Sequence, residues 1–152
     1  MMSDEVTQLL RKAYGDEMET VMNYLTNSII LDGVRAQEVK EGLRQDATQE
    51  EIQHAQMLGE RLKQLDARPP ASGEFVARQD SLQPPEDTAD VLSVIDGVIE
   101  AEEGAIQTYR SLIKAAQAAD DPVTEDLAVE ILGDEEAHRT EFKSYRREYS
   151  DE

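Results

Sequence analysis

The sequence predicts an all-α protein built as a four-helix bundle. Three observations lead to this fold class: long segments with apolar residues at helical spacing, prolines that stand only at breaks or in a first helical turn, and a length of 152 residues. We expect helices over about residues 3–31, 34–65, 88–119 and 122–149. The whole chain, residues 1–152, is expected to form a single domain.

The ends of the predicted helices come from capping residues and tight breaks. Ser3 is a good N-cap for the first helix, and Asp32-Gly33 supplies a short break after it. Asp120-Asp121-Pro122 is typical of an N-cap followed by proline in the first turn, so it opens the fourth helix. The first two helices and the last two are therefore expected to form two antiparallel pairs with very short loops.

A long crossover joins these two helix pairs. Residues 66–87 hold four of the five prolines, as Pro69-Pro70 and Pro84-Pro85, which prevents a continuous helix there. A single helical turn is expected within it, around Glu74 to Ser81. Short loops inside each pair and one long connection between the pairs differ from a simple up-down-up-down bundle.

The composition excludes several classes of function. The chain has 34 acidic and 15 basic residues and a formal charge of −19, so it should repel nucleic acid and anionic membranes. Cysteine is absent, which excludes thiol chemistry and thiolate metal sites. Residues Met1 to Leu10 have no basic stretch followed by an apolar run, and no segment approaches about 20 apolar residues, so we expect a soluble cytoplasmic protein. The lysine-poor acidic surface resembles that of proteins from salt-loving organisms.

Ionisable side chains stand in the middle of each apolar helical seam. The first helix contributes one, the second two, the third one and the fourth two: Glu17; Glu51 and His54; Glu102; Glu135 and His138. Four buried carboxylates without partners would cost several kcal/mol each. Two divalent cations would neutralise them and two neutral imidazoles would complete the ligand set, which indicates a dinuclear metal site. Oxygen-rich coordination with one histidine per metal favours iron, with manganese second.

An internal repeat supports this interpretation. Glu17 is followed after seven residues by Tyr24 and after 34 by Glu51, while the second half repeats the layout with Glu102, Tyr109 and Glu135 at spacings of seven and 33. The second glutamate of each half begins an E-x-x-H, whose first and last residues share one helical face. The two histidines of these motifs are the only ones in the chain.

At these residues the chain resembles the ferritin-like di-iron carboxylate proteins, and bacterioferritin most closely among them. The resemblance implies that Glu17 and Glu102 are terminal ligands, that Glu51 and Glu135 bridge two irons, and that His54 and His138 each bind one. It also implies supporting residues around the ligands. These are Tyr24 and Tyr109, which would hydrogen-bond to ligand carboxylates, and Glu50 and Asp134, which would orient the histidines.

The sequence departs from the bacterioferritin pattern in two places. Ile52 stands where bacterioferritins carry the haem-ligating methionine, so no haem is expected. The chain ends 14 residues after His138, without the short fifth helix of 24-subunit cages, so we expect a homo-oligomer such as a dimer or a smaller shell. Other acidic and sulfur-containing residues near the site are interpreted more simply: Glu19, Glu100, Glu103 and Glu136 as solvated surface charges, and Met18, Met22 and Met57 as core fillers.

The leading functional hypothesis is a ferroxidase that oxidises Fe(II) with O2 or H2O2 for storage or detoxification. Two enzymatic alternatives remain, a rubrerythrin-like peroxide reductase and a di-iron oxygenase acting on an organic substrate. The oxygenase would need an apolar pocket beside the metals. The non-enzymatic alternative is a Dps-like structural shell protein with an incidental metal site.

Overall fold

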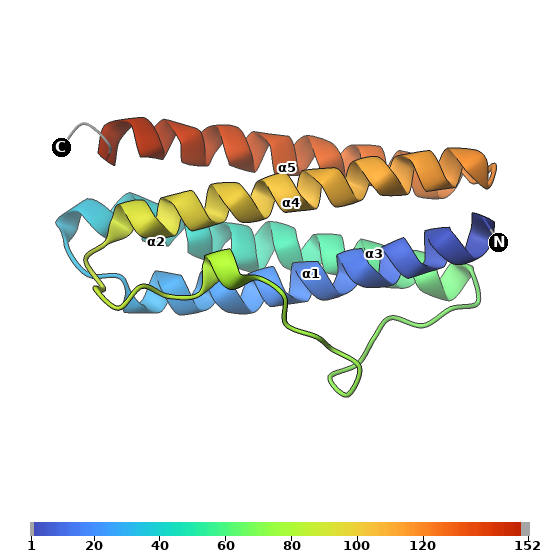
Figure 1. Cartoon of the computed structure of the whole chain (residues 1–152), viewed down its shortest axis with the longest axis horizontal. Helices are drawn as coiled ribbons and strands as arrows, with labels where there is room; N and C mark the ends of the chain where they lie inside the picture. The colour runs from blue at the N-terminus through green and yellow to red at the C-terminus, as the bar shows by residue number, and fades with distance from the viewer. Residues whose placement is uncertain (1, 150–152) are drawn as a thin grey trace.

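The computed structural model describes residues 2–149, which fold into a bundle of four helical rods (Figure 1). This confirms the predicted all-α four-helix class. Three rods are single helices: α1 (Met2–Ile30), α4 (Val91–Ala118) and α5 (Pro122–Tyr149). The remaining rod is composite and contains the short helix η1 (Val34–Ala36), α2 (Gln37–Gln45), η2 (Asp46–Glu51) and α3 (Ile52–Gln64).

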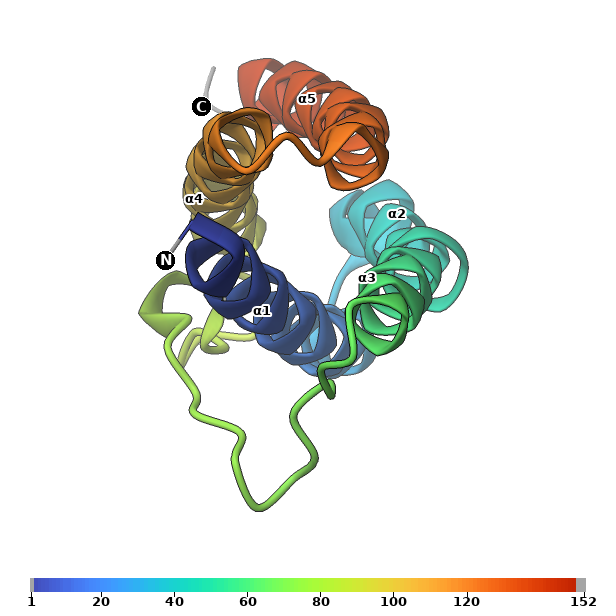
Figure 2. The ribbon, with the colours of Figure 1, turned by 90° about the vertical axis from the view of Figure 1, so that its right-hand side faces the viewer.

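The rods surround a common core when the bundle is viewed along its length (Figure 2). α1 packs against α3 and α4, and α5 packs against α4. The rods of each pair run in opposite directions, and the long crossover returns along the bundle from α3 to α4 (Figure 1). Among residues 2–149, which the structure describes, no helix has the length and apolar character that a membrane span requires.

The helix ends are set by local chemistry. α1 begins at Met2, so Ser3 lies within its first turn, and the prediction that Ser3 is the N-cap is wrong. Gly33 adopts φ 101°, a left-handed conformation in which a side chain would be strained, and it makes the break between the first two rods. Before α5, Asp121 acts as the N-cap, since its Oδ1 accepts a hydrogen bond of 3.0 Å from the backbone N–H of Thr124.

The composite rod differs from the continuous α-helix predicted over residues 34–65. Residues Asp46–Glu51 form a π-helix, in which each hydrogen bond spans one residue more than in an α-helix. Residues five apart on an α-helix point about 140° away from each other, at 3.6 residues per turn. The wider π-helical turn instead brings Asp46 and Glu51 to the buried side together. Periodicity at α-helical spacing could not have shown this.

The crossover lies outside α1 and α4 (Figure 2) and is fixed to them by hydrogen bonds. The only short helix within it among the described residues is η3 (Asp80–Leu82), so the turn predicted at Glu74–Ser81 is displaced toward the end of that range. Glu19 anchors it: its carboxylate accepts hydrogen bonds of 2.9–3.0 Å from the backbone N–H groups of Arg78 and Gln79. The interpretation of Glu19 as a solvated surface charge is therefore wrong, because the crossover covers the side of α1 that it occupies.

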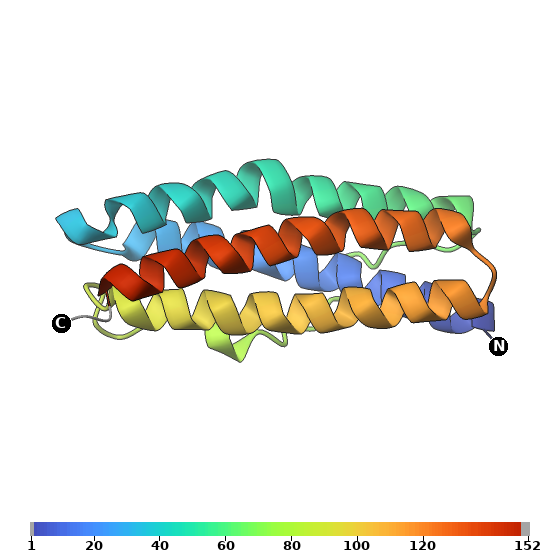
Figure 3. The same ribbon diagram turned by 90° about the horizontal axis from the view of Figure 1, so that it is seen from above.

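The four rods run side by side along the length of the bundle (Figure 3). The apolar core between them consists of two clusters. One contains Tyr24, Leu43, Ile95 and Phe142, and the other contains Leu10, Leu58, Tyr109 and Ile131, among others. The space between them holds the ionisable side chains described below.

The three methionines that were interpreted as core fillers do not all join this core. Met57 packs half-buried against the second cluster, as expected. Met18 is 37% exposed and Met22 is 63% exposed, so the prediction that they fill the core is wrong.

Candidate metal centre

The six ionisable side chains predicted as ligands lie together at mid-bundle, between the two apolar clusters. Each rod contributes at least one of them: Glu17 from α1, Glu51 from η2, His54 from α3, Glu102 from α4, and Glu135 and His138 from α5. Every one of these residues is at most 3% exposed. The centre is thus an interior site that needs all four rods.

These residues form two overlapping groups that could each hold a metal ion. The first consists of Glu17, Glu51, His54 and Glu135, and the second of Glu51, Glu102, Glu135 and His138; within each group the candidate ligand atoms all lie within 4.8 Å of one another. Glu51 and Glu135 belong to both groups. Their placement is the one that bridging carboxylates between two metals require.

The two imidazoles point the same nitrogen inward. Nδ1 of His54 lies 3.1 Å from Glu135 Oε1, and Nδ1 of His138 lies 3.2 Å from Glu51 Oε1. On the outer side, Nε2–H of His54 donates to Asp134 at 2.8 Å and Nε2–H of His138 donates to Glu50 at 2.6 Å. An Nε2–H held by a carboxylate leaves the Nδ1 lone pair free for a metal. Asp134 and Glu50 thus make the contacts that were expected of them.

The two tyrosines reach across the bundle. Tyr109 Oη on α4 donates to Glu17 Oε1 on α1 at 2.7 Å, and Tyr24 Oη on α1 donates to Glu102 Oε1 on α4. Each tyrosine therefore holds the candidate ligand glutamate of the opposite half of the chain. One oxygen of each glutamate is engaged in this way and the other faces the centre.

Unpaired polar atoms show that the site fits a metal. Eight buried side-chain atoms of the described residues have no hydrogen-bond partner, and six of them belong to the six predicted ligands, one atom each. They are one carboxylate oxygen from Glu17, Glu51, Glu102 and Glu135, and Nδ1 from His54 and His138. Orphaned buried polar atoms are rare and each costs about 1–3 kcal/mol. A cation at the centre would satisfy all six.

The electrostatics of the metal-free site favour bound protons. Burial raises the pKa of Glu51 and of Glu102 well above the usual range, and repulsion from neighbouring carboxylates adds to the effect. Burial opposes protonation of His54, but the nearby Glu135 and Glu17 carboxylates outweigh it and raise its pKa to about 11. The pKa of His138 is also raised, because Glu102, Asp46 and Glu50 surround it. Protons thus hold part of the charge that cations would otherwise neutralise.

Metal binding should therefore release protons and strengthen as pH rises. A metal needs deprotonated carboxylates and the free Nδ1 lone pair, so the bound state carries fewer protons than the metal-free state. We expect about two or more protons released per chain near pH 7, and an apparent affinity that falls on acidification toward about pH 5.5. Titration of the metal-free protein with Zn(II) in weak buffer with an indicator dye measures the release. The Glu103→Gln variant, altered at an exposed site, should match wild type, whereas proton release of zero would contradict the assignment.

Asp46 is a member of the site region that sequence reasoning missed. It is 4% exposed, its Oδ1 lies 3.8 Å from His138 Nε2, and burial raises its pKa to about 8. With Glu50 and His138 it forms a third group of clustered ligand atoms. Because His138 presents Nε2 to this group and Nδ1 to the centre, we interpret Asp46 as a neighbour that helps to hold the imidazole. Only the π-helical turn brings it inward.

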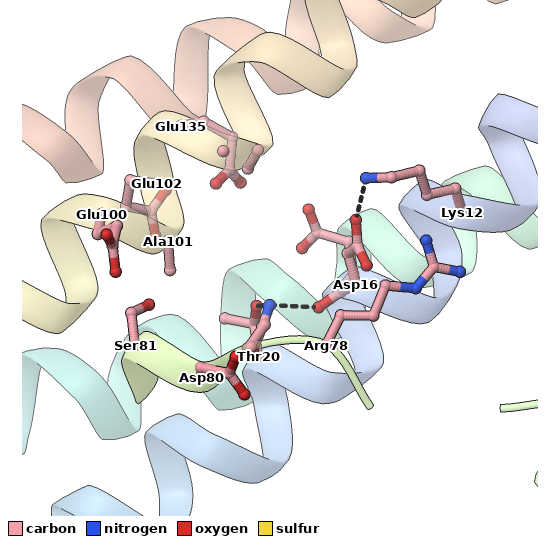
Figure 4. A pocket seen from close by; sticks show the side chains of 14 residues that line it. Lys12, Asp16, Thr20, Arg78, Asp80, Ser81, Glu100, Ala101, Glu102 and Glu135 are labelled. Atoms are coloured by element: carbon pink, nitrogen blue, oxygen red, sulfur yellow. Dashed lines mark hydrogen bonds and ion pairs between the residues drawn. The ribbon is translucent and has the colours of Figure 1, made fainter. Parts of the chain in front are cut away.

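A cavity of about 450 Å³ opens beside the centre, between α1, α4 and the crossover (Figure 4). Three candidate ligands line its floor: Glu17, Glu102 and Glu135. Most of the other lining residues carry polar or charged side chains, and Ala101, Gly104 and Ala105 complete the lining. These charged and polar groups suit water and hydrated ions.

Comparison with known proteins places these features in a family. The profile of the ferritin family, described as the ferritin-like domain, matches residues 7–150. The bacterioferritin of Desulfovibrio desulfuricans is 26% identical over 142 residues, covering 92% of this chain and 73% of that protein.

Solved structures with the same fold are similar over nearly the whole chain. The ferritin-like, diiron-carboxylate protein of Bacillus anthracis superposes with a TM-score of 0.85 at 19% identity, covering 96% of this chain and 98% of the other. The diiron bacterioferritin of Desulfovibrio desulfuricans gives 0.80 at 23% identity, covering 99% and 85%. A dodecameric thioferritin of Bacteroides fragilis, described as bacterioferritin-related, gives 0.84 at 21% identity, covering 99% and 88%.

Proposed function

Because this chain belongs to the ferritin family of ferritin-like domain proteins, we propose that its buried centre binds two Fe(II) ions and oxidises them with O2 or H2O2. Glu17 and Glu102 would each bind one iron, Glu51 and Glu135 would bridge both, and His54 and His138 would complete the two sets. The observation that carries the proposal is the convergence of six unpaired ligand atoms in two groups that share Glu51 and Glu135. Carboxylate and imidazole ligands favour iron, with manganese as the second choice.

Oxidation of two Fe(II) ions supplies two electrons. With H2O2 as oxidant, these electrons and two protons yield two water molecules, and two Fe(III) ions remain for storage or detoxification. The six side chains would hold the ions, and their carboxylates would balance the positive charge. The cavity beside Glu17, Glu102 and Glu135 would give the oxidant access to the ions. No haem is expected, because Ile52 has no atom that could ligate iron.

Iron loading separates this function from the alternatives. Fe(II) is added in air to metal-free protein in increasing amounts, oxidation is followed by ultraviolet absorbance, and the iron retained is measured after size-exclusion chromatography with light scattering. Retention well above two iron ions per chain supports storage, as does growth of a mineral within an oligomer. Oxidation that stops at two per chain favours a rubrerythrin-like peroxide reductase or a di-iron oxygenase. Iron that binds without oxidation favours a Dps-like structural shell.

We further propose that the chain forms a homo-oligomer, a dimer or a shell. The related thioferritin of Bacteroides fragilis is described as a dodecamer. The outer side of α1 carries exposed apolar side chains, Met22 at 63% and Ile29 at 69%, as the surface of a subunit contact would. The light-scattering mass from the iron-loading experiment tests this directly. The cytoplasmic location and the salt-loving source remain predictions from the sequence.

A further inference from the structure

One side of the bundle leads directly to the candidate metal centre. The cavity between α1, α4 and the crossover is bounded on its inner side by Glu17, Glu102 and Glu135, all of them candidate ligands. Its outer boundary includes exposed residues such as Asp80 and Glu100. The cavity therefore connects the surface with the ligand atoms.

The opposite side of the centre is covered by the two histidines. There the His54 ring lies between the centre and Asp134, and the His138 ring lies between the centre and Glu50. Asp134 and Glu50 are 46% and 40% exposed at their side chains, while both imidazoles are nearly buried. An ion approaching from that side would have to displace an imidazole that is hydrogen-bonded outward. The cavity side presents no such obstacle.

Small residues give the cavity its width. Ala101, Gly104 and Ala105 of α4 all line it, on the same helix as the lining residues Glu100 and Glu102. A Cβ atom built on Gly104 would meet nothing within 4 Å, so the space beside it is open. A long side chain at this position would project into that space.

The crossover wall of the cavity is held in place. The side-chain amide of Gln79 donates to Thr20 Oγ1 at 2.7 Å and to the backbone oxygen of Asp16 at 3.2 Å. Its backbone N–H donates to the buried Glu19 carboxylate at 2.9 Å. The cavity is therefore a built feature with a fixed wall.

Charge is distributed unevenly around the cavity. Figure 4 shows Asp80, Ser81 and Glu100 on one side and Lys12 and Arg78 on the other. The ammonium of Lys12 is paired with Asp16 at 2.9 Å, so its charge is largely compensated. The side with Asp80 and Glu100 remains acidic and attracts cations, and it lies beside the ligand Glu102.

We infer that this cavity is the route by which divalent metal ions reach the buried centre, with Asp80 and Glu100 drawing them to its mouth and Gly104 keeping it open. The inference rests on the proposed function, because without a metal centre no ion would need this route. Asp80, Glu100 and Gly104 would thus act in metal uptake without touching the bound metals.

The test measures how fast Co(II) binds to metal-free protein, by stopped-flow absorbance. The matched pair is Gly104→Leu on α4 and Gly133→Leu on α5. Both glycines are exposed on helices, and an added Cβ would meet nothing within 4 Å at either position. Of the two, only Gly104 lines the cavity. We expect Gly104→Leu to load at least about tenfold more slowly than wild type and Gly133→Leu to load at the wild-type rate, both reaching the wild-type stoichiometry.

A second pair tests the charge. Glu100→Gln removes an acidic group at the mouth, whereas Glu103→Gln removes an exposed one on the same helix outside the cavity lining. At low salt Glu100→Gln should load about threefold more slowly than Glu103→Gln, and the difference should vanish at about 1 M salt.

The outcomes are separable. Wild-type rates in both Gly104→Leu and Glu100→Gln overturn the route while leaving the centre intact. If circular dichroism shows that Gly104→Leu is misfolded, the glutamate pair decides alone, and equal loading by Glu100→Gln and Glu103→Gln overturns the route. If the wild-type protein binds no Co(II), the proposed metal centre fails, and the route fails with it.

Discussion

Replacing Glu51 by alanine is expected to abolish Fe(II) oxidation, lowering its rate by at least about 100-fold. Glu51 belongs to both groups of candidate ligands, so its loss removes a ligand from each metal position at once. Loss of a single metal-supporting group commonly costs 10–100-fold, and a shared ligand should exceed that range. His138→Ala should have a comparable effect through one position. Stopped-flow absorbance after mixing with Fe(II) in air gives the rates.

The fold should survive both changes. Burial and the neighbouring carboxylates raise the pKa of Glu51 well above its usual range, so this buried acid group does not stabilise the metal-free protein, and helical content by circular dichroism should stay at the wild-type level. Glu136→Ala serves as the control, since Glu136 adjoins the candidate ligand Glu135 in sequence but lies near the surface, paired with Arg110 at 3.4 Å. Wild-type oxidation rates in both Glu51→Ala and His138→Ala would eliminate this centre as the site of iron chemistry.

The Gly97→Ala substitution should destabilise the protein by about 2–4 kcal/mol. A Cβ atom on Gly97 would stand 2.0 Å from the backbone oxygen of Ser81 in the crossover, much closer than a real contact allows. The neighbour is backbone and it is also tied to α4, because Ser81 Oγ donates to the Gly97 oxygen at 3.1 Å. The crossover must therefore move away from α4.

The matched control is Gly104→Ala on the same helix. An added Cβ meets nothing within 4 Å there, and alanine favours a helix interior by about 1 kcal/mol over glycine, so this variant should be slightly more stable than wild type. Urea unfolding followed by circular dichroism gives both free energies. If Gly97→Ala proved as stable as Gly104→Ala, the close packing of the crossover on α4 would be refuted.

The main lines of the fold could be predicted because they depend on local signals that the sequence states directly. Apolar spacing of 3.6 residues marks the rods, Asp121 before Pro122 marks the start of α5, and the paired prolines mark the crossover. The six candidate ligands could also be identified from the sequence, since their positions in the apolar seams and their repeat both depend on spacing along regular helices. Their common location in the structure agrees with that reasoning, and their role as metal ligands stays a proposal.

What the sequence did not reveal depends on irregular backbone or on packing between distant segments. Asp46 faces inward only because residues Asp46–Glu51 form a π-helix, and no residue pattern announces that change of turn. Glu19 lies on the side of α1 away from Glu17, and its burial depends on where the crossover passes. Met18 and Met22 are apolar and sit at a plausible core spacing, yet they face outward. Each case required the three-dimensional course of the chain.

The reciprocal arrangement of the centre has a consequence for how the protein assembles. Each four-residue group takes three members from one helix pair and one from the other, and the tyrosines Tyr24 and Tyr109 cross between the pairs in the same way. Neither hairpin of the chain could therefore hold even one complete ligand set by itself. Closing the two hairpins onto each other creates the site, and cations bound there would fasten the hairpins together and raise the stability of the folded bundle.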